Sequence, residues 1–77
     1  MKYLVLEIQV SKDGSVAMPA VKDYNSRNEA ESSYFNVLSY AAVSTIYKHS
    51  ALIVDEEGTL LLKRTYVHDD DNLANQS

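Results

Sequence analysis

The strands that this sequence predicts carry apolar residues on both sides, yet a single predicted helix is available to cover them. Val5 interrupts the polar side of the first strand, the run from Ala51 to Val54 is apolar throughout, and Leu60 to Leu62 is continuous leucine. Such runs are typical of strands that are buried on both faces of a sheet. Since one helix covers one face, the sequence predicts that a second copy or another protein covers the other.

The chain is too short to build a large core of its own. With 77 residues it forms one small domain. A domain of that size buries only roughly 60% of its unfolded surface on folding. The chain has no cysteine, which excludes disulfides, zinc–thiolate sites and thiol nucleophiles. Association with another chain is the remaining common way to bury more apolar area.

The charge pattern disfavours nucleic-acid binding. The formal net charge is −4 and the seven basic residues are scattered, whereas a phosphate backbone requires clustered positive charge. The only adjacent basic pair, Lys63 and Arg64, lies in a predicted strand, where neighbouring side chains point to opposite faces. Glu7 comes too early for a signal peptide, and no apolar run approaches the roughly 18 residues of a membrane span. We therefore expect an intracellular protein that binds neither nucleic acid nor membrane.

Hydrophobic periodicity predicts a hairpin, a helix and a second hairpin. Strict alternation marks the first strand, and Asp13-Gly14 supplies the positive-φ residue that a hairpin turn needs. Ser26 and Glu29 have the spacing of a capping box, which begins a helix. The predicted strands cover residues 2–10, 16–24, 50–55 and 60–68, and the predicted helix runs from Ser26 to near Ile46.

These elements predict an α+β fold of ββαββ order, a four-stranded, mainly antiparallel sheet with one helix packed on one face. Residues 1–68 form the domain, and the acidic and polar residues 69–77 predict a disordered tail. Pro19 cannot donate to a strand ladder, so the second strand lies at an edge or contains a bulge. The strand orders 2-1-3-4 and 2-1-4-3 both satisfy this condition.

Alternation in the first strand also predicts which of its sides faces the helix. Leu4, Leu6, Ile8 and Val10 form the more apolar side and are predicted to face the core, which leaves Tyr3 and Val5 on the opposite side. Tyrosine suits an interface because its large ring ends in a polar group. The predicted interface residues are Tyr3, Val5, Leu60, Leu61, Leu62 and Tyr66.

No residue pattern in the chain predicts catalysis or a resident cofactor. His49 and His68 are the only histidines, and with the consecutive aspartates 69–71 they suggest, as the alternative, a metal or small-ligand site. Ordering such a tail costs about 1 to 2 kcal/mol per residue, so we predict no metal site. Glu7 is the only carboxylate expected to meet an apolar environment, and only when a partner covers its face. We therefore predict a protein that is not an enzyme and holds no cofactor.

Three blocks of the sequence resemble small uncharacterised proteins of phages and prophages of Gram-positive bacteria. The blocks are residues 2–9, residues 27–32 continuing to 41–44, and residues 49–51 continuing to 57–58. The resemblance covers most of the first 68 residues and contains no functional motif. It implies a viral structural or accessory protein, located in the bacterial cytoplasm or in the virion.

These observations predict a small non-enzymatic interaction or structural module that forms homo-oligomers or binds a protein partner. The contact surface is the sheet face opposite the helix. The alternative is the ligand- or metal-binding accessory protein that uses His49, His68 and the acidic tail. A third class, an acidic inhibitor of a basic host protein, fits the net charge but has no localised sequence feature.

Overall fold

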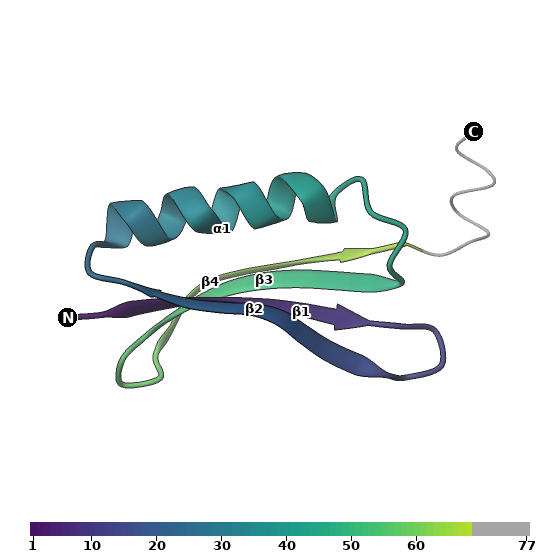
Figure 1. Ribbon diagram of the computed structural model, residues 1–77, viewed down its shortest axis with the longest axis horizontal. Coiled ribbons are helices and arrows are strands. Elements are labelled where there is room, and N and C mark those ends of the chain that lie inside the picture. Colours follow the sequence, from purple (N-terminus) through teal and green to yellow (C-terminus); the bar gives the residue numbers. More distant parts are fainter. Residues whose placement is uncertain (69–77) are drawn as a thin grey trace.

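The computed structural model describes residues 1–68 and confirms the predicted order of elements. A single helix lies along one face of a four-stranded antiparallel sheet, so the fold is α+β (Figure 1). The elements are β1 (Tyr3–Val10), β2 (Val16–Tyr24), α1 (Arg27–Ala41), β3 (Lys48–Asp55) and β4 (Leu60–Val67). The predicted tail, residues 69–77, lies outside the described residues.

The strand order is β2-β1-β3-β4, the first of the two predicted orders. Pro19 therefore lies in an edge strand. The register of β1 with β2 also shifts between Glu7 and Gln9, where Met18 and Pro19 together lie opposite Ile8. The edge position and the bulge were predicted as alternatives for the strand that contains Pro19, and β2 has both.

Helix α1 begins where the sequence predicts but ends earlier. The Ser26 hydroxyl accepts a hydrogen bond from the Glu29 backbone N–H at 3.1 Å, which caps the first turn. The helix ends at Ala41, not near Ile46. The residues that follow include β-branched Val43, Thr45 and Ile46, whose side chains lose rotamer freedom in a helix and favour extended backbone.

The helix covers the side of the sheet that was predicted to be open. Val5 is only 4% exposed and Ile53, its partner on β3, is fully buried. The buried core consists of Val5, Ala30, Tyr34, Leu38, Ala41, Ala51 and Ile53. Because side chains alternate along a strand, Leu4 and Leu6 point away from α1. The predicted core face of β1 was therefore wrong, and the more apolar side of the strand is the uncovered one.

Candidate interaction surface

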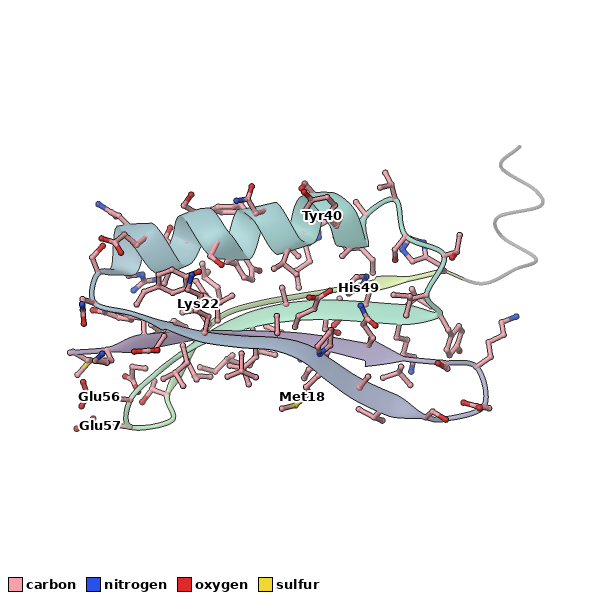
Figure 2. The ribbon with its side chains drawn as sticks, in the orientation of Figure 1. Met18, Lys22, Tyr40, His49, Glu56 and Glu57 are labelled. Atoms are coloured by element: carbon pink, nitrogen blue, oxygen red, sulfur yellow. The ribbon has the colours of Figure 1, made fainter. Side chains whose placement is uncertain are left out.

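The sheet face opposite α1 carries a continuous apolar area that spans three strands, here called the open face. The register places Leu6 between Val21 on β2 and Leu52 on β3, all pointing away from the helix. Figure 2 shows side chains projecting from this side of the sheet, with Met18 among them. The residues of the open face are Leu4, Leu6, Ile8, Val10, Val16, Met18, Val21, Leu52 and Val54.

The margins of the open face are strongly exposed. On β2, Val16 is 66% exposed, Met18 53% and Val21 52%. The β1 residues Leu4 and Leu6 are half-buried because strands flank them on both sides. An apolar area of several neighbouring side chains on a protein surface marks an interaction site.

Polar groups border this face at its ends. At one end, the Lys2 ammonium lies 2.8 Å from the Asp23 carboxylate. The hydrogen bond between these side chains, and then their opposite charges, favour the ionised form of each, so the pKa of Asp23 is lowered and that of Lys2 is raised. Over β3 and β4, the Ser50 and Thr65 hydroxyls are hydrogen-bonded at 2.8 Å. An apolar centre with a polar rim is the usual composition of a protein interface.

Most of the predicted interface residues lie on the covered side. Val5 is in the core, and Tyr3, Leu61, Leu62 and Tyr66 pack against it. Their predicted position opposite the helix is wrong for Val5 and Tyr3, because the core face of β1 was inverted. Leu60 pairs with Val54 and is 52% exposed, so it extends the open face. The apolar alternation of β1 was the sequence signal for this face. It was assigned to the core instead, so the face was placed on the wrong side of the sheet.

A polar cluster lies beneath the C-terminal end of α1. His49 is 3% exposed, and its Nε2–H donates to the carboxylate of Glu7. The Nδ1 atom of His49 lies 3.0 Å from the Ser44 hydroxyl, which is 3.3 Å from the Ala41 carbonyl. Gln9 donates a further hydrogen bond to Glu7 at 3.2 Å. Figure 2 shows His49 between helix and sheet, where these bonds fasten the loop after α1 to β1 and β3.

The serine, histidine and carboxylate of this cluster are the residue types of an acyl-transfer triad, and the Ser44 hydroxyl also lies within hydrogen-bond distance of the Ala41 carbonyl. A cavity of about 250 Å³ is lined by Ser11, Lys12, Thr45, Ile46, Tyr47 and His68. Neither Ser44 nor His49 lines it. Within residues 1–68, every buried side-chain nitrogen and oxygen has a hydrogen-bond partner. The cluster therefore satisfies a buried imidazole, which is a structural role.

The two histidines make separate contacts in this structure. The Nε2–H of His68 donates to the Ala41 carbonyl at 2.7 Å, and its ring stacks on Tyr66. His49 is bonded to Glu7 and Ser44 instead. Among the described residues, no three histidines, cysteines or acidic residues are grouped to hold a metal ion. The aspartates 69–71 lie outside that range, so the metal-site alternative stays a prediction.

In comparisons with known proteins, no family model, curated protein or solved structure matches this chain. In the part of the chain that the structure describes, no helix is long and apolar enough to cross a membrane.

Proposed function

We propose that this protein is a non-enzymatic interaction module that self-associates through the open face. The observation that carries the proposal is the distribution of apolar residues between the two faces. The helix covers a narrow core around Val5 and Ile53, whereas within residues 1–68 no element covers the alternating leucines of β1 and their neighbours on β2 and β3. Burying apolar area contributes about 25 cal/mol per Å², so a partner on this face stabilises the domain.

A second copy has a surface of suitable size and character. Strands of eight residues at about 3.3 Å per residue, in four rows about 4.8 Å apart, form a sheet face of about 26 by 19 Å. The open face occupies the rows of β1, β2 and β3, and the row of β4 adds Leu60 and polar residues. Two such sheet faces that overlap fully bury about 1,000 Å², which reaches the lower limit of specific interfaces. The sheets would lie about 10 Å apart with both helices outside.

The resemblance to phage and prophage proteins supports a place for this module in a larger assembly. A subunit of a phage particle or a prophage accessory protein, in the bacterial cytoplasm or the virion, is the setting that we propose. In that setting the open face supplies the contact between copies. No nucleic acid, membrane or cofactor takes part.

The test compares two valine-to-aspartate variants by light scattering across a dilution series. Val21 lies on the open face and is 52% exposed, whereas Val43 follows α1 and is 81% exposed. A charge at either position is tolerated by the monomer because both side chains already contact solvent. We expect the wild type and Val43→Asp to be oligomeric and Val21→Asp to have at least a tenfold weaker association. A monomeric wild type at all concentrations, or equal masses for the two variants, contradicts the proposal.

A further inference from the structure

The two edges of the sheet differ in how well they resist pairing with another strand. Edge strand β2 contains Pro19 and the bulge opposite Ile8, and both features obstruct strand addition. At the other edge, β4 contains no proline. Its register with β3 is regular from Lys48 and Val67 to Ile53 and Leu62. The outer edge of β4 is therefore straight over these residues.

Hydrogen bonding within the β3–β4 hairpin determines which backbone groups of β4 point outward. The His68 N–H donates to the Tyr47 carbonyl, and hydrogen-bonded pairs alternate along an antiparallel ladder. The backbone of Leu62, Arg64 and Tyr66 therefore bonds to β3. The 2.8 Å contact between the Ser50 and Thr65 hydroxyls agrees with a close, non-hydrogen-bonded pair. The N–H and C=O groups of Lys63, Thr65 and Val67 remain for an outside strand.

We propose that β4 pairs antiparallel with β4 of a second copy, with Thr65 opposite Thr65, and so forms a continuous eight-stranded sheet. In this register both Thr65 residues exchange N–H···O=C bonds, and Lys63 exchanges them with Val67 of the second copy. The outward backbone groups of all three residues are then satisfied. Strand addition of this kind is a common mode of protein recognition.

Charge disfavours the registers that are shifted toward the start of β4. Pairing centred on Lys63 places two lysines opposite each other, and pairing centred on Arg64 does the same with two arginines, which is destabilising. Centring on Thr65 places Arg64 opposite Tyr66 of the second copy. The Arg64 guanidinium already lies 4.8 Å from the ring centre of Tyr66 within its own strand. The same cation–π pair thus forms across the new ladder.

Edge pairing and stacking of the open faces use different atoms. The edge contact uses the backbone of β4, whereas the proposed function rests on side chains of β1, β2 and β3. If both contacts form, four copies assemble as two stacked eight-stranded sheets. Either contact forms without the other, so the two are tested separately.

The test uses single-cysteine variants, because the natural chain has no cysteine. In the proposed register the two Thr65 Cα atoms lie about 5.5 Å apart, within the range of about 4.4 to 6.8 Å that a disulfide spans. Under mild oxidation with oxidised glutathione we expect Thr65→Cys to form a disulfide-linked dimer. Lys63→Cys and Val67→Cys should each stay uncrosslinked. In the proposed register, residue 63 of one copy lies about 13 Å, or four residues, along the strand from residue 63 of the other copy, and the same holds for residue 67. An equimolar mixture of these two variants should crosslink.

Two comparisons make the result specific. Tyr40→Cys, on the exposed outer side of α1, measures random collision, and we expect Thr65→Cys to crosslink at least tenfold faster. Equal rates for Thr65→Cys, Lys63→Cys and Tyr40→Cys overturn the proposal. The double variant Val21→Asp/Thr65→Cys separates the two surfaces. If the double variant still crosslinks, edge pairing occurs without face stacking. If the double variant no longer crosslinks, the face contact is what brings the two copies of residue 65 together, and the edge register is overturned.

Discussion

The two faces of this sheet contain opposite arrangements of polar and apolar residues. The covered face has a narrow apolar core beside a buried polar cluster of Glu7, His49 and Ser44. The open face has uninterrupted aliphatic residues along β1. In most one-helix sheets the more apolar side would be expected to meet the helix. In this chain the helix instead covers the less apolar side of β1.

The surface that α1 buries is narrow. Its buried residues are two alanines, one tyrosine and one leucine, at positions 30, 41, 34 and 38. A helix with side chains is about 10 to 12 Å wide, which covers about two strands of a sheet. Its contacts are accordingly greatest with β3 and β1. Residues 1–68 contain a single helix, and it lies on one face of the sheet. The opposite face is therefore exposed in a single copy of this domain.

The largest predicted effect distinguishes two neighbouring residues of β3 that point to opposite faces. Ile53 is fully buried under α1, and Ile53→Ala should lower the free energy of unfolding by about 2 to 5 kcal/mol. Leu52→Ala, on the open face, should cost less in dilute solution and more as protein concentration rises, because the copies then associate. Urea unfolding at two protein concentrations measures both. Equal costs at both concentrations would show that Leu52 takes no part in association.

The next effect concerns the polar cluster of the covered face. Replacing Glu7 by leucine leaves the Nε2–H of buried His49 without its acceptor, at a cost of about 1 to 3 kcal/mol. Gln9→Leu removes only a donor to the partly exposed Glu7 carboxylate and should cost less. Thermal unfolding of the two variants gives the comparison. If Gln9→Leu proves the more destabilising, the structural role of the cluster is refuted.

A smaller effect tests the attachment of the covering helix. Ser26→Ala removes the hydroxyl that accepts from the Glu29 N–H and should destabilise the fold by about 1 kcal/mol. Ser39→Ala is the matched control, because its hydroxyl donates to the Asn36 carbonyl on an exposed part of α1. Chemical denaturation of both variants measures the difference. A cost for Ser39→Ala as large as that for Ser26→Ala would show that capping contributes nothing specific.

The smallest effect is a pH dependence on the covered face. Burial raises the pKa of the Tyr34 hydroxyl above its ordinary value of 10.0. The folded chain thus holds this proton longer than the unfolded chain, and its contribution to stability is lost as pH rises above about 10. Tyr34→Phe should therefore reduce the loss of stability that follows as the pH rises above about 10. Tyr40→Phe, at an exposed position, should leave the profile unchanged.

Local sequence signals predicted the elements of this fold but not its sidedness. Asp13-Gly14, the Ser26 cap and Pro19 act over a few residues, so the first turn, the start of α1 and the edge position of β2 were all predictable. The choice of the covered face depends instead on how Val5 aligns with Ile53 and on which side α1 lies. The partnership of Glu7 with His49 depends on the same alignment. Residues so far apart in sequence give no pairing signal in a single chain.

The central β1–β3 ladder joins residues from opposite ends of the domain, from Tyr3 with Asp55 to Val10 with Lys48. Each hairpin closes locally on a timescale of about 1 to 10 μs, whereas the centre of the sheet forms only when the two hairpins meet. Loop-closure entropy must be overcome before that contact is gained. We therefore expect docking of the two hairpins to limit the folding rate. Substitutions at the β1–β3 seam should slow folding, and those at the outer edges should mainly speed unfolding.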